Sequence, residues 1–156
     1  MTDHEDTRLP HVDTEKNNTA NGQRMRFLIK NPKLNRVMLI NATFSLLCAA
    51  ISALFASALA ELIGINEVFI FYGLAVGLSL FAADLIKTAR HDQAVPLWRV
   101  YYFSLSDLAW VLASAILIFG LNLLSEQGEV LVGGIAMIVA VFGLTQLAFA
   151  TQAKPA

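Results

Sequence analysis

An aspartate lies inside an otherwise apolar, helix-like stretch of the sequence, FSLSDLAWVLAS at residues 103–114. Asp107 is the residue whose type and setting most directly suggest chemistry, because a carboxyl group at the centre of a lipid-embedded helix costs about 2.5–3.5 kcal/mol on insertion scales. It should therefore face protein or water and be paired there. Such a carboxyl serves either as a hydrogen-bond clamp between helices or as part of a cytoplasm-facing pocket or proton-binding site.

Each of the other three apolar segments carries a strong polar residue of its own, namely Asn41, Asp84 or Gln146. Counted at 1.5 Å per residue from the nearest Lys or Arg, these residues and Asp107 lie roughly 4.5–12 Å along their helices, in one half of the bilayer. Ser104 adds a hydroxyl to the Asp107 face. We expect these five residues to form a polar layer in which Asn41 or Gln146 is the nearest polar neighbour of Asp107. Asp84 could instead pair within its own helix or sit in the interface.

Four apolar segments must position these residues, at about 37–60, 68–86, 100–124 and 130–152. The chain is 56% hydrophobic and 15% charged, with a mean hydropathy of +0.60, outside the usual range of soluble domains. Each segment approaches or exceeds the ~20 residues that a membrane span needs, and none alternates strictly as a barrel strand does. We predict an all-α, integral membrane four-helix bundle with up-down-up-down topology over residues 36–152. Residues 1–35 are expected to form a disordered cytoplasmic tail that ends in a basic juxtamembrane segment.

The positive charges are distributed on one side of this predicted topology. All 11 Lys and Arg residues lie before the first segment, between the second and third, or after the fourth. The connections after the first and third segments contain glutamates and no Lys or Arg, so the positive-inside rule places both termini in the cytoplasm. The cations next to the first segment are Arg24, Arg26, Lys30, Lys33 and Arg36. We expect them to contact anionic lipid, and topology explains them without a nucleic-acid partner.

Small residues indicate how the helices pack. Gly73 and Gly77 form a GxxxG pair in the second segment, a pattern that allows two membrane helices to approach closely. The first segment carries small residues at helical spacing: Ser45, Ala49, Ser52, Ala56 and Ala60. We expect the glycine pair and this small-residue face to pack together.

The sequence contains no recognisable catalytic or cofactor signature. The three histidines, His4, His11 and His91, lie outside the apolar segments, which argues against a b-type haem or a histidine metal site in the membrane. Cys48 is the only cysteine, so the chain cannot form an internal disulfide or a CxxC site. HExxH, GxSxG and nucleotide-binding loops are absent from the sequence. We therefore expect no cofactor, no metal and no enzymatic activity.

Three stretches, NATFSLLCAA (41–50), FAADLIKTAR (81–90) and SDLAWVLASAILIFG (106–120), resemble a group of small bacterial four-span integral membrane proteins. The resemblance covers residues 37 to about 150 and implies a helical bundle in the bacterial inner membrane. Our leading hypothesis is an accessory or scaffold subunit that associates with itself or with a larger membrane complex. The alternative is a small oligomeric transporter or proton-coupled carrier that uses Asp107.

Overall fold

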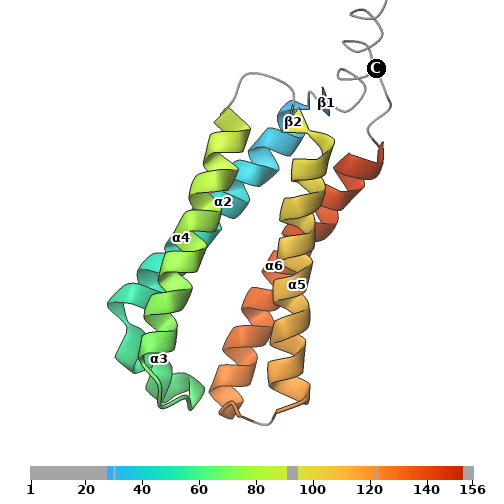
Figure 1. Ribbon diagram of the computed structural model, residues 1–156. Helices are drawn as coiled ribbons and strands as arrows, with labels where there is room; N and C mark the ends of the chain where they lie inside the picture. Colours follow the sequence, from blue (N-terminus) through green and yellow to red (C-terminus); the bar gives the residue numbers. More distant parts are fainter. Residues whose placement is uncertain (1–27, 30, 91–94, 122, 153–156) are drawn as a thin grey trace, which may run out of the picture.

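The computed structural model describes residues 28–29, 31–90, 95–121 and 123–152 and has four long helices that run alternately down and up (Figure 1). These are α2 (Pro32–Leu54), α4 (Phe69–Arg90), α5 (Leu97–Phe119) and α6 (Glu126–Gln152). Each is long and apolar enough to cross a membrane, which fits a multi-pass membrane protein. The prediction of an all-α four-helix bundle is confirmed.

Helix α2 begins before the predicted first span. The side chain of Asn31 caps the helix by accepting a hydrogen bond from the Lys33 backbone N–H at 3.0 Å, and Pro32 occupies the first turn, where its missing N–H costs nothing. Lys33 and Arg36 therefore belong to the helix itself. Arg24, Arg26 and Lys30, the other expected lipid contacts, lie outside the described residues.

The predicted first span is divided into two helices. The chain breaks at Phe55 (φ −117°, ψ 27°), and the short helix α3 (Ala56–Ile63) follows. Helix α3 ends at Gly64, whose φ of 86° is a left-handed conformation that glycine adopts without steric cost. The backbone N–H groups of Gly64 and Ile65 both donate to the Ala60 carbonyl, which closes the helix end.

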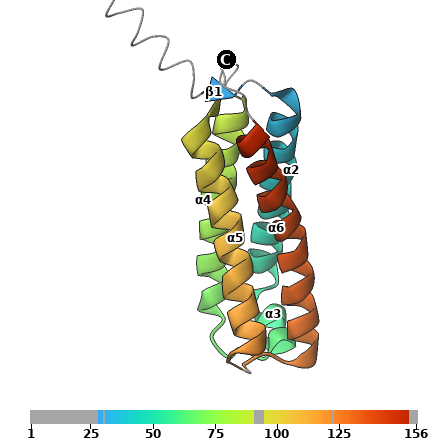
Figure 2. The same cartoon turned by 90° about the vertical axis from the view of Figure 1, so that its right-hand side faces the viewer.

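The long helices pack as two antiparallel hairpins. Helix α2 lies along α4 and α5 along α6, while α2 and α3 both contact α6 and so connect the hairpins (Figures 1 and 2). Helices α4 and α5 make little contact with each other. The larger hydrophobic core lies toward the end where α2 and α5 begin: Leu34, Met38, Ala42, Ala82, Leu85, Ala89, Val95, Val100, Phe103 and Ala150. A smaller core lies at the opposite end: Ala56, Ala60, Ile63 and Phe71.

A short antiparallel ladder lies at the end with the larger core. Strand β1 (Leu28–Ile29) pairs with β2 (Val95–Pro96), with Leu28 opposite Pro96 and Ile29 opposite Val95. Val95 is buried in the larger core. The ladder thereby links the segment before α2 to the connection between α4 and α5.

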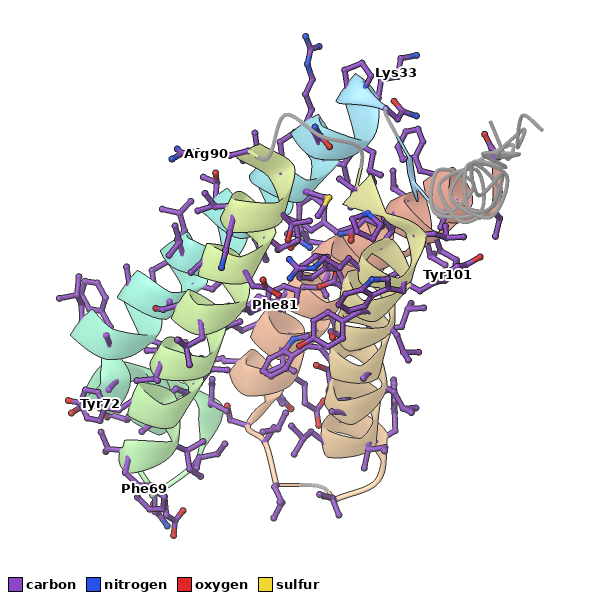
Figure 3. The ribbon with its side chains drawn as sticks, turned by 45° about the horizontal axis from the view of Figure 1, so that its top comes forward. Lys33, Phe69, Tyr72, Phe81, Arg90 and Tyr101 are labelled. Atoms are coloured by element: carbon purple, nitrogen blue, oxygen red, sulfur yellow. The ribbon has the colours of Figure 1, made fainter. Side chains whose placement is uncertain are left out.

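Charged and aromatic residues mark the two ends of the bundle. The described cations lie within the first two turns or the last turn of their helices, at the end with the larger core: Lys33, Arg36, Lys87, Arg90 and Arg99. Figure 3 shows Lys33 and Arg90 at this end and Phe69 and Tyr72 at the other. The charge asymmetry of the sequence thus becomes an asymmetry between the ends of the folded bundle. We call these the cation-rich end and the opposite end.

Candidate functional site

Asp107 lies inside the bundle and joins three helices. Its side chain on α5 is only 4% exposed, and its Oδ2 accepts hydrogen bonds from Asn41 Nδ2 on α2 at 2.8 Å and from Gln146 Nε2 on α6 at 3.1 Å. Asn41 and Gln146 are themselves buried, at 1% and 0% exposure. Both amides that were expected to neighbour Asp107 therefore donate to the same carboxylate oxygen.

A close approach of α5 and α6 holds Asp107 in this position. Ser104 Oγ donates to the Gly143 carbonyl at 2.7 Å. A Cβ atom added to Gly143 would lie 3.1 Å from the Asp107 Cβ and 3.3 Å from the Ser104 carbonyl oxygen, so a larger residue fits only if its neighbours move. Gly143 is one helical turn from Gln146, and this spacing is the signal by which the sequence could have indicated its role.

Among the described residues, no positively charged side chain is bonded to the Asp107 carboxylate. Asp107 makes no salt bridge within the part of the chain that the structure describes, and both of its hydrogen-bond donors are neutral amides. Gln146 Oε1 is buried and has no hydrogen-bond partner among the described residues. The site therefore has spare acceptor capacity and excess negative charge when Asp107 is ionised.

Asp84 does not join this cluster, contrary to the expectation of a five-residue polar layer. Its Oδ1 lies 3.3 Å from Arg99 Nη1, which also donates to Thr88 Oγ1 at 2.5 Å. The side chain of Asp84 is 42% exposed and that of Arg99 is 31% exposed. Helix α4 ends and α5 begins at the same end of the bundle. Asp84, near the end of α4, therefore pairs with Arg99 in the first turn of α5 and not with the Asp107 cluster. The layer therefore consists of Asn41, Ser104, Asp107 and Gln146.

The predicted packing of Gly73 and Gly77 against the first segment is wrong. A Cβ added at either glycine would meet no atom of the described structure within 4 Å, and both residues are exposed. The small-residue face of α2 and α3 is buried as expected. Helix α4 turns a different face inward, with its buried alanines at Ala75, Ala82 and Ala89. Residues two positions apart on a helix point in nearly opposite directions, so burial of Ala75 turns both glycines away.

The two glycines instead line a cavity between the hairpins. The cavity has a volume of about 660 Å³ and is lined by residues of all four long helices and of α3. Asn41 and Asp107 belong to its wall, and so does Cys48. The rest of the wall is mainly apolar and extends to the smaller core: Phe44, Leu59, Ile63, Phe71, Leu74, Leu78, Phe81, Trp110, Leu131, Ile135 and Val139. Asp107 therefore lies at one end of a largely apolar chamber.

The cavity opens sideways rather than toward the cation-rich end. Gly73 and Gly77 on α4 and Trp110 on α5 line it and are exposed, which indicates a mouth between these two helices. Toward the cation-rich end, the Phe81 ring of α4 contacts the Phe103 ring of α5 edge-on, with centroids 5.8 Å apart, and the larger core follows. Phe81 lies between the hairpins in Figure 3.

A pocket open at the cation-rich end, the geometry of the alternative role considered for Asp107, is not what the described residues form. The half of the bundle nearer the cation-rich end is filled by the larger core, with Leu34, Met38 and Phe103 fully buried. The polar residues can be located from the sequence, but the space between the helices cannot, because that space depends on which helices pair and on the break at Phe55.

The side chains around Asp107 are suited to binding an organic molecule rather than a metal ion. In the described part of the chain, no three or more His, Cys, Asp and Glu side chains are grouped so that they could hold a metal ion. The arrangement offers an apolar chamber with a hydrogen-bonded carboxyl at one end.

A scan against protein-family models finds no family that matches the chain, and searches of the curated proteins and of the solved structures find no match either.

Proposed function

We propose that the protein is a small, non-enzymatic membrane carrier that binds a lipid-soluble molecule in the cavity between its hairpins. The observation that carries this proposal is the cavity of about 660 Å³ with Asp107 in its wall. Sites for small molecules typically enclose about 300–1,000 Å³ and combine apolar walls with a few convergent polar groups. A carboxyl in this position can also take up or release a proton, as a proton-coupled carrier requires.

The lateral mouth supports entry from the bilayer. Both helices that border it, α4 and α5, are long and apolar enough to span a membrane, and in a bilayer the gap between them would face lipid. Trp110, which is 37% exposed, lies at this border. A molecule dissolved in the lipid could reach Asp107 through the mouth without crossing the packed core.

We further propose that the protein resides in a bacterial inner membrane with both termini in the cytoplasm. The support is the grouping of the described cations at one end of the bundle and the positive-inside rule. Lys33 and Arg36 would then contact anionic lipid at the cytoplasmic face, together with the cations before them in the sequence. In this orientation the cavity would extend from the middle of the bundle, where Asn41 and Asp107 lie, toward the outer face of the membrane.

Mass analysis of the protein extracted from its native membrane tests the carrier proposal. We expect the wild type to retain a non-protein molecule in stoichiometric amount. Gly77→Phe should lose it, because the new ring projects into the cavity that Gly77 lines, whereas Gly77→Ala should keep most of it. Equal occupancy of the wild type and Gly77→Phe, or no bound molecule in either, would refute the proposal.

A second candidate is an accessory or scaffold subunit, alone as a homo-oligomer or within a larger complex. It is favoured by the exposure of Gly73 and Gly77, where a helix of another subunit could approach the α4 backbone. The same mass measurement separates the two functions. A stoichiometric second polypeptide without a small molecule would support the scaffold.

A further inference from the structure

We infer that the ligand of this cavity is a lipophilic organic cation, whose positive charge pairs with Asp107 and whose apolar body fills the chamber. This inference rests on the proposed carrier function and specifies its substrate class. It is drawn from the charge balance of the site and from the chemistry of the cavity wall.

The charge balance favours a positively charged ligand. Asp107 is 4% exposed and its two hydrogen-bond donors, Asn41 Nδ2 and Gln146 Nε2, carry no charge. The amides satisfy one carboxylate oxygen but leave the negative charge of the ionised carboxyl without a counterion. Burying an uncompensated charge away from water is costly, so a cation that enters with little hydration of its own is stabilised there.

The described cations of the protein do not supply this counterion. Arg99, which precedes Asp107 on α5, is bonded to Asp84 and Thr88 on α4. Lys33, Arg36, Lys87 and Arg90 belong to helix turns at the cation-rich end. A bound ligand can therefore provide the compensating charge at Asp107 without displacing a salt bridge of the described structure.

The Asp107 carboxylate selects against an anion. The Asn41 amide in the cavity wall already donates its Nδ2 to Asp107, and the wall hydroxyls of Ser45, Ser52 and Ser106 can donate or accept and so do not discriminate by charge. An anionic group in the cavity would meet the like charge of the ionised Asp107 carboxylate. The cavity wall also contains the rings of Phe44, Phe81 and Trp110, whose faces attract cations.

The test compares two probe ions of the same shape and opposite charge, tetraphenylphosphonium and tetraphenylborate. Binding is measured to the full-length protein in nanodiscs of uncharged lipid, with empty nanodiscs subtracted. We expect saturable binding of tetraphenylphosphonium and none of tetraphenylborate. Asp107→Asn should weaken cation binding at least about tenfold, because it removes one partner of a buried charge pair. Asp84→Asn is the matched control and should bind as the wild type, because Asp84 lies outside the cavity wall.

A second readout applies even if Asp107→Asn fails to fold. Cys48 is the only cysteine and lines the cavity, so tetraphenylphosphonium should slow its alkylation in the wild type, and tetraphenylborate should not. Equal effects of the two ions, no effect of either, or unchanged cation binding by folded Asp107→Asn would overturn the inference. If these ions fail but mass analysis finds an uncharged molecule, only the substrate class is wrong. If neither experiment finds a ligand, the carrier function fails as well.

Discussion

Among single residues, Asp107 would combine a structural and a binding role in the proposed carrier. Its Oδ2 joins α5 to α2 through Asn41 and to α6 through Gln146, while its side chain also belongs to the cavity wall. The structural role and the binding role require different properties of the residue. Hydrogen bonding depends on its shape and polarity, whereas compensation of a cation depends on its charge.

Substitution at Asp107 should separate these two roles. Asp107→Asn should fold with a stability close to that of the wild type, because an amide keeps the shape and part of the hydrogen bonding. Asp107→Leu should lower the free energy of unfolding by roughly 1–3 kcal/mol, because it leaves the buried Asn41 and Gln146 amides without an acceptor. Reversible unfolding in mixed micelles measures both. An Asp107→Leu variant as stable as the wild type would show that the cluster is not a clamp.

The same glycine-to-alanine substitution at two positions, Gly143 and Gly77, tests which of them lies at a close contact between helices. Gly143→Ala should destabilise the protein by about 1–3 kcal/mol, because its Cβ would lie 3.1 Å from that of Asp107. Gly77→Ala has space at its Cβ and should be neutral or stabilise the helix by up to about 1 kcal/mol. The same unfolding measurement compares them. The reverse order of stabilities would mean that Gly77, and not Gly143, marks the close helix contact.

At the scale of elements, the described contacts across the α4–α5 gap are few. Arg99 on α5 reaches Asp84 and Thr88 on α4, and the Phe81 and Phe103 rings meet in the same half of the bundle. Beyond them, toward the opposite end, Gly73 and Gly77 leave the gap open. Arg99 and Phe103 thus supply the described side-chain contacts that cross the gap, whereas α2 and α3 join the hairpins through α6.

The ion pair should contribute little stability despite its position. Asp84 and Arg99 are 42% and 31% exposed, so water screens their attraction. A double-mutant cycle with Asp84→Asn and Arg99→Gln should give a favourable coupling below about 1 kcal/mol. Strictly additive effects would show that the pair does not form. A coupling well above this value would mean that the pair is more shielded from water than its exposure indicates.

The sequence predicted these elements well where composition determines them and poorly where packing does. Apolar length identified four spans, but the break at Phe55 has no proline or glycine to signal it. The GxxxG pair indicated a helix contact, whereas the buried face of α4 carries Ala75, Ala82 and Ala89. Alanines spaced seven apart are hard to recognise in a segment rich in small residues.

The hydrogen-bonded cluster of the candidate site could be predicted from the sequence, but the cavity beside it could not. Buried polar groups need partners, and this requirement, together with the depth of each residue along its helix, correctly linked Asp107 to Asn41 and Gln146. The cavity could not be predicted, because an empty volume depends on how α4 and α5 diverge and leaves no pattern in the sequence. Arg99 was considered only as a topological charge, and its contact with Asp84 required the structure.

At the scale of the whole molecule, the orientation in the membrane can be measured by thiol labelling. In a Cys48→Ser background, cysteines placed at Asn66 or Gln127 should react with an impermeant reagent added outside intact cells, because both belong to the opposite end of the bundle. A cysteine at Arg90 should stay unreactive until the membrane is permeabilised, because Arg90 lies at the cation-rich end. Labelling of the Arg90 position in intact cells would invert the proposed topology.

Lipid-soluble molecules should enter the cavity between the hairpins. A small apolar diazirine, photolysed with the protein in lipid nanodiscs and mapped by peptide mass analysis, detects such entry. Ser45 and Ser52 line the cavity but are each only 5% exposed, so label at these residues requires entry into the chamber. We expect label there in the wild type and its loss in Gly77→Phe, while lipid-facing Leu80 and Leu112 are labelled equally in both proteins. Label confined to Leu80, Leu112 and other lipid-facing positions in the wild type would show that the cavity does not admit lipid-soluble molecules.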